Sequence, residues 1–430
     1  MADPIDPEQG GDGLVYDWNL VDSRRPIVRG DRVTFFDESL RDGIQSPSVR
    51  DPVIEDKLRI LHLMDSLGIQ YADIGLPGAG GRAVSDVTRI TREIVDARLR
   101  IKPAAAGRTH LSDLRAIADI SQKTGVALEV MAFLGSSPIR QYAENWDVER
   151  MATMTRDAVT FCVAEGLPTT FVTEDTIRSR PETLDRLFRT ALDCGATRLT
   201  LCDTCGHATP DGVRALVKFA RSIVDAMGLR KTVLLDWHGH NDRGLALVNS
   251  IVALEAGVER LHGTALGIGE RVGNTSMDQL LMNLRLLGVI EQDLTHLGEY
   301  CHTVSRATDV AIPVNYPLVG SDAFRTATGV HAAAIIKAQK KGDAWLADRI
   351  YSGVPAGLFG LGQVIEIGPM SGLSNVTWWL ERHGVAAEPG LAEAVFAAAK
   401  QSDHTLTEPE VLALVRRVKH DSQVGESRSA

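Results

Sequence analysis

The sequence predicts an α/β fold, a (β/α)8 barrel followed by a C-terminal helical region. Eight short apolar runs each precede a segment with helical periodicity, a pattern typical of repeated βα units and a parallel sheet. From about residue 290 onward, helical segments follow one another without intervening strands. A doubly wound open sheet is the competing architecture. It needs fewer strands and usually a glycine-rich first turn, and no GxGxxG follows the first run.

The eight runs are the expected barrel strands. The helical segments between them include EDKLRILHLMDSLG after the first run and DGVRALVKFARSIVDAMG after the sixth. In chain order the runs are VTFFD (33–37), YADIGL (71–76), LRIKPAA (99–105), ALEVMAFL (127–134), TTFVT (169–173), RLTLCD (198–203), TVLLDWH (232–238) and ERLHGTA (259–265).

Composition changes along the chain divide it into four parts. Residues 1–30 are polar and rich in Gly and Asp, so we expect an N-terminal arm. Residues 31–290 form the predicted barrel, and 291–420 the predicted helical region, with Gly- and Pro-rich turns between its helices. The last ten residues, 421–430, are polar, and we expect a disordered tail.

Composition and charge exclude several classes of function. The hydrophobic fraction of 44% and the charged fraction of 24% are ordinary for a soluble globular protein. The net charge is −10 and no Lys/Arg cluster is long, so we expect no nucleic-acid partner. No apolar run could span a membrane, and the N-terminus has no apolar signal region. We therefore expect a cytoplasmic protein. Its five cysteines, an odd number in a long chain, argue against a disulfide framework.

Polar residues collect where the predicted strands end. In a barrel of this kind, functional groups lie at the C-terminal ends of the strands. The first run leads into DESLRDGIQS, which places Arg41, Asp42 and Gln45 at the rim. The fifth run ends at Glu174, and the sixth is followed by Thr204. A plain apolar core would not need these groups.

The seventh run ends in DWHGHND. Side chains alternate along a strand, so His238 and His240 share one face and point toward the barrel mouth. With Asp42 they would supply two nitrogens and one carboxylate, a set suited to divalent ions such as Zn2+, Mn2+, Co2+ or Fe2+. The alternative is a pair of hydrogen-bonded core histidines, because a lone HxH is common by chance.

Three motifs in order resemble those of a known family. FFDESLRDGIQS resembles the D-x-x-L-R-D-G-x-Q opening of the acyl-CoA Claisen-condensing TIM-barrel metalloenzymes. WHGHNDRGLALVN is similar to their H-x-H-N-D-x-G-x-A-x-x-N, and GIGERVGN to their G-x-G-E-R-x-G-N. The family includes isopropylmalate, homocitrate, citramalate and Re-citrate synthases, with hydroxymethylglutaryl-CoA lyase as a cousin. The resemblance covers roughly residues 33–290. Phosphono- and phosphinomethylmalate synthases are further family members that the chain resembles.

The resemblance implies roles for individual residues. Asp42, His238 and His240 match metal ligands, and Asn274 matches an asparagine that binds or borders the metal. Arg41 matches the arginine that stabilises the enolate and keto oxygens. Glu174 matches an acid that works beside a histidine. His331 matches the histidine of the base system, although TGVHAAA departs from the usual SGIHQDG. Substrate contacts are implied for Gln45, Asp73 and Thr204.

The resemblance also implies cofactors and partners. It predicts one divalent ion (Zn2+, Mn2+, Mg2+, Co2+ or Fe2+), with acetyl-CoA as co-substrate and a small 2-oxo acid as acceptor. It further predicts a homodimer in which the helical region of each subunit serves as a lid and dimerisation element over the partner's barrel. His331 would then act in the partner's site.

Two segments predict the kind of oxo acid. SPIRQY, with Arg140, is similar to the R-Q-[YF] of homocitrate synthases, and Arg108–His110 (RTH) is similar to their R-C-H. An arginine at an apolar pocket is costly unless it meets an anion, which its planar fork suits. We therefore expect Arg140 and His110 to contact an oxo acid with a second anionic group, namely oxaloacetate, 2-oxoglutarate or phosphono/phosphinopyruvate. Alternatively, Arg140 is a surface residue paired with Glu144 or Asp147.

Other functions stay open at this point. An isopropylmalate- or citramalate-type synthase would take an apolar 2-oxo acid. A metal-dependent aldolase or lyase could use the same barrel, although the lyase cousin carries a Gly-Cys-Pro stretch where this chain has GIGERVGN. A barrel that keeps its metal but only binds a partner is the non-enzymatic alternative. The intact polar set at the strand ends argues against it.

Overall fold

The computed structural model describes residues 14–20 and 33–429, with side chains described as far as residue 421. The chain divides into two compact units. One contains residues 24–312 and the other contains 313–430 together with the first 23 residues. Most of the predicted arm, 1–30, lies outside the described residues. The exception is a segment that includes the short helix η3 (Trp18–Leu20).

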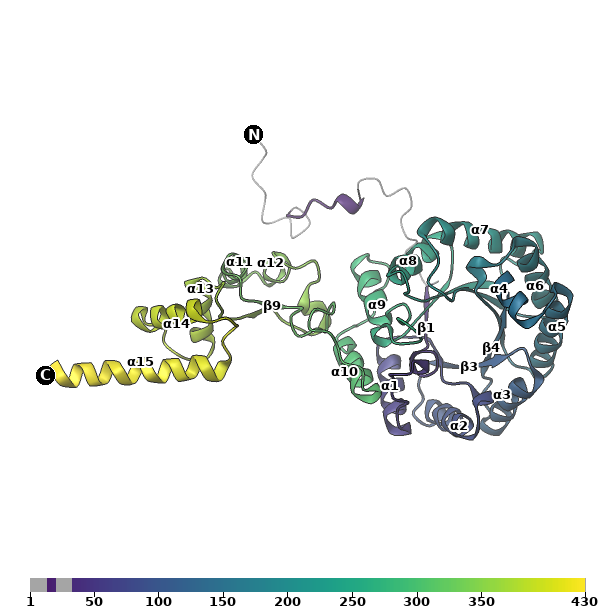
Figure 1. The fold of residues 1–430 in the computed structure, drawn as a ribbon, viewed down its shortest axis with the longest axis horizontal. Coiled ribbons are helices and arrows are strands. Elements are labelled where there is room, and N and C mark those ends of the chain that lie inside the picture. Colours follow the sequence, from purple (N-terminus) through teal and green to yellow (C-terminus); the bar gives the residue numbers. More distant parts are fainter. Residues whose placement is uncertain (1–13, 21–32, 430) are drawn as a thin grey trace. The chain divides into compact units, whose positions relative to one another are not determined.

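The first unit is a closed barrel of eight parallel strands in the order β1 to β8 (Figure 1). This confirms the predicted (β/α)8 fold. Closure is made by β1 and β8, with Phe36 opposite His262 and Asp37 opposite Gly263. The strands are β1 (Thr34–Asp37), β2 (Tyr71–Asp73), β3 (Lys102–Arg108), β4 (Glu129–Gly135), β5 (Thr169–Glu174), β6 (Arg198–Asp203), β7 (Leu234–Gly239) and β8 (Arg260–Gly263).

Helices surround the barrel and follow its strands in turn (Figure 1). The local sequence determines where several helices begin. Asp147 and Thr209 accept hydrogen bonds from backbone N–H groups in the first turns of α5 and α7, respectively. Pro210 occupies the first position of α7. The helices are α1 (Ile54–Ser66), α2 (Gly81–Asp96), α3 (Leu111–Thr124), α4 (Pro138–Glu144), α5 (Val148–Ala164), α6 (Pro181–Asp193), α7 (Pro210–Ala226), α8 (Ala246–Ala256), α9 (Met277–Leu286) and α10 (Leu297–Thr308).

The barrel unit continues past residue 290, where the sequence predicted its end. Helix α10 packs against α1, and its Leu297, Tyr300 and Val304 are buried. The apolar face of α10 is therefore part of the barrel's outer layer, and the unit ends at Ile312.

The barrel interior is both apolar and charged. Phe36, Ala104 and Met131 are among the residues of a buried apolar cluster. The fully buried Arg260 at the start of β8 binds Glu129 at the start of β4, with nitrogen–oxygen distances of 2.6 and 2.8 Å. The strands β8 and β4 lie on opposite sides of the closed sheet, so this ion pair spans the barrel.

The second unit is mainly helical, as predicted. A two-stranded sheet of β9 (Arg325–Thr326) and β10 (Val364–Ile365) accompanies its helices. Helix α15 runs to Ser429, through most of the stretch 421–430 that the sequence predicted to be disordered. The helices are α11 (Gly329–Lys340), α12 (Ala344–Arg349), α13 (Leu373–Arg382), α14 (Pro389–Gln401) and α15 (Glu408–Ser429).

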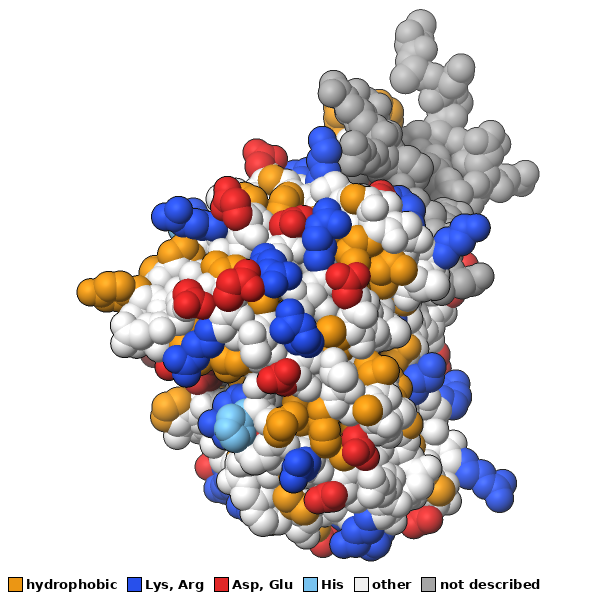
Figure 2. All heavy atoms as spheres, turned by 90° about the vertical axis from the view of Figure 1, so that its right-hand side faces the viewer, with side chains coloured by type: hydrophobic (Ala, Val, Ile, Leu, Met, Phe, Trp, Pro, Cys, Tyr) orange, Lys and Arg blue, Asp and Glu red, His pale blue; other side chains and the backbone are white. Residues whose placement is uncertain are grey.

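Two surface properties bear on partners. Among the described residues, no helix combines the length and apolarity that crossing a bilayer requires. On the face drawn in Figure 2, basic and acidic side chains are interspersed instead of being separated into regions of one sign.

Candidate active site

Asp42, His238 and His240 meet at one end of the barrel. Asp42 follows β1, His238 lies in β7, and His240 follows that strand directly. All three are buried, and ligand atoms from the three side chains lie within 4.8 Å of one another. Asp42 Oδ2 is 3.6 Å from His240 Nε2. The structure thus brings together the two histidines and the carboxylate that the sequence predicted as metal ligands.

Asn274 adjoins this trio. Its Nδ2 donates to Asp42 Oδ2 at 2.8 Å and to the carbonyl of Ile268 at 3.1 Å, and its backbone forms an isolated bridge with His240. The glycines of GIGERVGN permit this approach. Gly273 has φ +89°, and a Cβ there would clash with the carbonyl oxygen of Gly267.

The donor set fits a divalent ion. His240 Nδ1 and Asn274 Oδ1 are buried without a hydrogen-bond partner in the part of the chain that the structure describes. Burial, together with the neighbouring His238, lowers the pKa of His240 to about 4, so its ring is neutral, as a ligand must be. Two imidazoles, a carboxylate and an amide oxygen are ligand types that Zn2+, Mn2+, Co2+ and Fe2+ accept.

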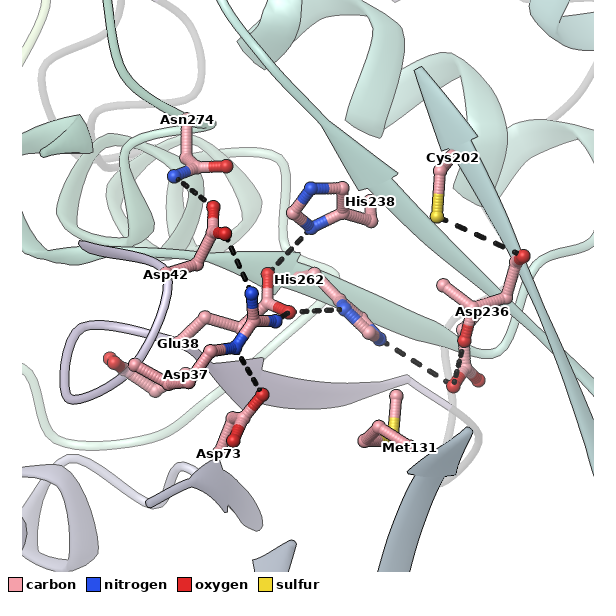
Figure 3. A network of polar contacts seen from close by, with 12 residues as sticks. Asp37, Glu38, Asp42, Asp73, Met131, Cys202, Asp236, His238, His262 and Asn274 are labelled. Carbon is pink, nitrogen blue, oxygen red and sulfur yellow. Dashed lines mark hydrogen bonds and ion pairs between the residues drawn. The ribbon is translucent and has the colours of Figure 1, made fainter. Parts of the chain in front are cut away.

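Arg41 lies beside the trio and binds the carboxylates of Glu38, Asp42 and Asp73. Figure 3 labels these three acids. Its Nη1 donates to Asp42 Oδ1 at 2.6 Å and its Nη2 to Glu38 Oε1 at 2.9 Å. Its Nε donates to Asp73 Oδ2 at 2.7 Å. Asp73 is fully buried, and burial raises its pKa to about 6 despite Arg41. Asp73 therefore holds Arg41 in place through an ion pair, and its contact with substrate stays a prediction.

Glu38 is the residue that sequence reasoning missed. Glu38 Oε2 is 2.6 Å from His238 Nδ1, and Glu38 Oε1 is 3.3 Å from His262 Nδ1. Burial alone would raise the pKa of Glu38, but His238 and His262 hold it well below its usual range. The available signal was the position of Glu38 three residues before Arg41, next to the end of β1.

A cavity of about 270 Å3 opens at the trio. It is part apolar, with Met131, Phe133 and Val172 in its wall, and part polar. Thr204 lies in the wall and accepts a hydrogen bond from the backbone N–H of Asp175 at 2.8 Å. The candidate residues that line this cavity are Arg41, Asp42, Gln45, Glu174, Thr204, His238 and His240.

A second cavity, of about 330 Å3, contains Arg140 and His110, and Glu174 lines both cavities. Burial raises the pKa of Glu174, although Arg140 and Arg41 act to lower it. Arg140 Nη2 is 3.2 Å from Glu144 Oε1, and the Arg140 side chain is 49% exposed. Arg140 therefore lines a cavity next to Glu174 while keeping the surface partner that the alternative interpretation named.

Arg108 and His110 of the RTH segment both already have side-chain partners. Arg108 forms a fork with Asp113, at 2.7 and 2.9 Å. His110 is the N-cap of α3, and its Nδ1 is 2.8 Å from Ser112 Oγ. The structure thus places His110 in the second cavity with its Nδ1 in use and its other ring nitrogen available.

His331 belongs to the C-terminal unit. It lies on α11, is exposed, and stacks on Tyr351 with ring centroids 4.0 Å apart. Its role beside Glu174 stays a prediction.

Curated proteins related to this chain include several named synthases. The homocitrate synthase AksA of Methanopyrus kandleri is 31% identical over 86% of this chain and 87% of its own length. A probable 2-isopropylmalate synthase of the same organism is 33% identical over 71% of this chain and 59% of its own length. A homocitrate synthase of Pyrococcus abyssi is 29% identical over 89% of this chain and 99% of its own length.

Solved structures show the same fold. The HMG-CoA lyase of Bacillus subtilis matches with a TM-score of 0.53 at 20% identity, over 65% of this chain and 94% of its own. The lyase of Brucella melitensis matches with a TM-score of 0.53 at 17% identity, over 64% of this chain and 99% of its own. The profile of the HMGL-like family matches residues 32–304, well over half of the sequence. The chain therefore belongs to the HMGL-like family.

Proposed function

We propose that the protein is an acetyl-CoA:2-oxo acid C-acetyltransferase, which condenses acetyl-CoA with a 2-oxo acid and releases CoA. The observation that carries this proposal is the convergence of Asp42, His238 and His240 beside Arg41 in a cavity. Relatives named homocitrate and 2-isopropylmalate synthase, aligned over most of this chain, support it.

Asp42, His238, His240 and Asn274 would hold a divalent ion. When bound, such an ion supplies Lewis-acid polarisation of the oxo acid's carbonyl. Arg41 is fixed by three carboxylates, so its guanidinium stabilises negative charge on the keto and enolate oxygens without having to reorganise.

Glu174 is suited to proton transfer. Burial raises the pKa of this carboxyl toward the range in which a general base is most effective. It lines the cavity of the trio, and we place the methyl group of the thioester in that cavity. Glu174, assisted by His331, would take the proton whose removal forms the enolate, and Thr204 would contact the acceptor's carboxylate.

We further propose that the acceptor carries a second anionic group. Arg140 supplies a cation in the cavity next to Glu174, and its partner Glu144 is a half-exposed carboxylate that an incoming dianion can replace. Oxaloacetate, 2-oxoglutarate and phosphono/phosphinopyruvate are the candidates.

A specific observation favours a second candidate. The wall of the first cavity contains Leu76, Met131, Phe133 and Val172, which would accept an apolar side chain. Arg140 already has Glu144 as a partner. A synthase of the isopropylmalate or citramalate type, using an apolar 2-oxo acid, is the function that this arrangement would serve.

A thiol reagent that reports free CoA distinguishes the candidates. The metal-loaded protein is mixed with acetyl-CoA and a panel of 2-oxo acids, and the dianionic acids should give the highest kcat/KM. Arg140→Ala should lower kcat/KM more for the best dianionic acid than for 2-oxoisovalerate. Arg189→Ala is the matched control, because Arg189 also pairs with an acid four residues away on a helix. No CoA release with any acid would contradict the synthase proposal.

A further inference from the structure

Glu38 is buried among the groups of the site, and both of its carboxylate oxygens are engaged. Oε2 meets His238 Nδ1 at 2.6 Å, and Oε1 accepts from Arg41 Nη2 at 2.9 Å. Figure 3 shows the Glu38 carboxylate joined by dashed lines to His238 and His262. One side chain thus contacts both a candidate metal ligand and the cation that faces the substrate.

The contact with His238 fixes which nitrogen carries the proton. An ionised carboxylate only accepts hydrogen bonds, so His238 Nδ1 must be the N–H donor. In the neutral ring Nε2 then carries the lone pair. A lone pair on Nε2 is what a metal ion requires, and a carboxylate on the other nitrogen is the usual partner of a metal-binding histidine.

We infer that Glu38 is a positioning residue, which holds His238 in the Nδ1–H tautomer and fixes the Arg41 guanidinium beside it. The inference rests on the proposed metal site. Neither the relatives' names nor the motifs assign this role to Glu38.

A second metal ion is the competing explanation, because Glu38, His238 and His262 also lie within 4.8 Å of one another. One observation favours the positioning role: Glu38 Oε2 and His238 Nδ1 are already joined by a hydrogen bond at 2.6 Å.

The geometry predicts an unusual order of effects for two substitutions. In Glu38→Gln, the amide oxygen must face Arg41, since a guanidinium can only donate. The amide NH2 then points at His238 Nδ1, which favours the tautomer with its proton on Nε2 and blocks the metal-binding lone pair. Glu38→Ala imposes no tautomer. The nearly isosteric Gln variant should therefore bind metal more weakly than the Ala variant, whereas a purely structural role predicts the opposite order.

The experiment combines metal affinity with NMR. Zn2+ affinity, measured by competition with a chelator, should fall about 10–100-fold in Glu38→Gln and less in Glu38→Ala. The 15N shifts of the His238 ring in the metal-free protein, at a pH where the ring is neutral, should show Nδ1–H in the wild type and Nε2–H in Glu38→Gln. Asp37→Asn is the matched control. Asp37 is equally buried but accepts from Ser39 and Tyr300 instead of a ligand.

Each outcome separates the explanations. If the wild-type protein, for which no variant is needed, has the His238 proton on Nε2, the inference is overturned. A lower Zn2+ affinity in Glu38→Ala than in Glu38→Gln also overturns it. Two Zn2+ ions per chain in the wild type would establish the second metal site and also overturn it. A wild type that binds no metal while its His238 shows Nδ1–H would contradict the proposed function and leave the tautomer assignment standing.

Discussion

At the scale of single residues, Arg41 is the best-defined part of the site. Its three nitrogens each bind a different carboxylate, from Glu38, Asp42 and Asp73. Burial would lower its pKa, but the three neighbouring carboxylates raise it, so the charge is permanent. Only the planar fork of a guanidinium can serve three acceptors in this way.

Arg41→Lys should therefore keep a positive charge but lose the orientation of the donors. We expect kcat to fall about 10²-fold or more, in line with the removal of one donor to a developing oxyanion. Metal content, measured by elemental analysis, should stay at the wild-type level, because no metal ligand is changed. A kcat within a few-fold of wild type would contradict a role in stabilising the enolate.

Glu174 determines the direction in which kcat/KM changes with pH. A general base acts in its ionised form, so kcat/KM should rise with pH as Glu174 loses its proton. Burial raises its pKa, so this limb should lie at higher pH than for an exposed glutamate. Arg140 opposes the rise, so Arg140→Ala should move the limb to still higher pH. Profiles of kcat/KM against pH, measured at saturating metal for the wild type and Arg140→Ala, check this. A limb that stays in place or moves to lower pH in Arg140→Ala would contradict it.

At the scale of elements, the loop between β8 and α9 shapes the site. It carries Asn274 to Asp42 and requires Gly273 in a left-handed conformation with no room for a Cβ. The backbone N–H of Asn274 donates to the carbonyl of Gly267 at 2.9 Å, which holds the loop in this path.

Gly273→Ala should displace Asn274 and weaken metal binding at least several-fold, with titrated Zn2+ affinity as the measurement. Gly244→Ala is the matched control. Gly244 also has positive φ (+70°), but a Cβ there would meet open space. If the two variants lost the same affinity, backbone strain alone would explain the effect, and the close packing at Gly273 would not matter.

Local patterns predicted the strands and the trio, but not what depends on barrel closure. His238 and His240 could be paired from strand alternation, and Asp42 from the strand-end rule. Glu38 and His262 come together because β1 pairs with β8, with Phe36 opposite His262. No local pattern encodes that register. The third strand lies at Lys102–Arg108 instead of 99–105, because small residues such as Ala104 pack well inside the barrel yet give little strand signal.

At the scale of the whole molecule, the C-terminal unit exposes apolar side chains near His331. Val330 and Met370 are 69% and 71% exposed, and the backbone N–H of Gly329 donates to the carbonyl of Met370 at 3.0 Å, so they lie close together. Tyr351, stacked on His331, is 50% exposed. Apolar groups gathered on a surface commonly mark an interface. The homodimer stays a prediction.

Mixing two inactive variants tests whether His331 acts across such a dimer. A subunit with His331→Ala keeps its barrel residues, and a subunit with Asp42→Ala keeps His331. If His331 acts in the partner's site, exchange between the two variants should restore activity to about a quarter of the wild-type rate, since half the dimers are mixed and each has one complete site. No recovery, despite mixed dimers seen by native mass spectrometry, would place His331 in its own subunit's site.

The ion pair that spans the barrel has a consequence for how the chain could be divided. Cut after the fourth strand, the protein would leave Glu129 on one fragment and Arg260 on the other. Asp42 and the pair His238 and His240 would be separated in the same way. Glu129 would lose its arginine, whereas Arg260 would keep Asp236, at 2.5 and 2.8 Å, on its own fragment. Neither fragment could assemble the metal site, so uptake of metal by a mixture of the two would report that the halves had rejoined.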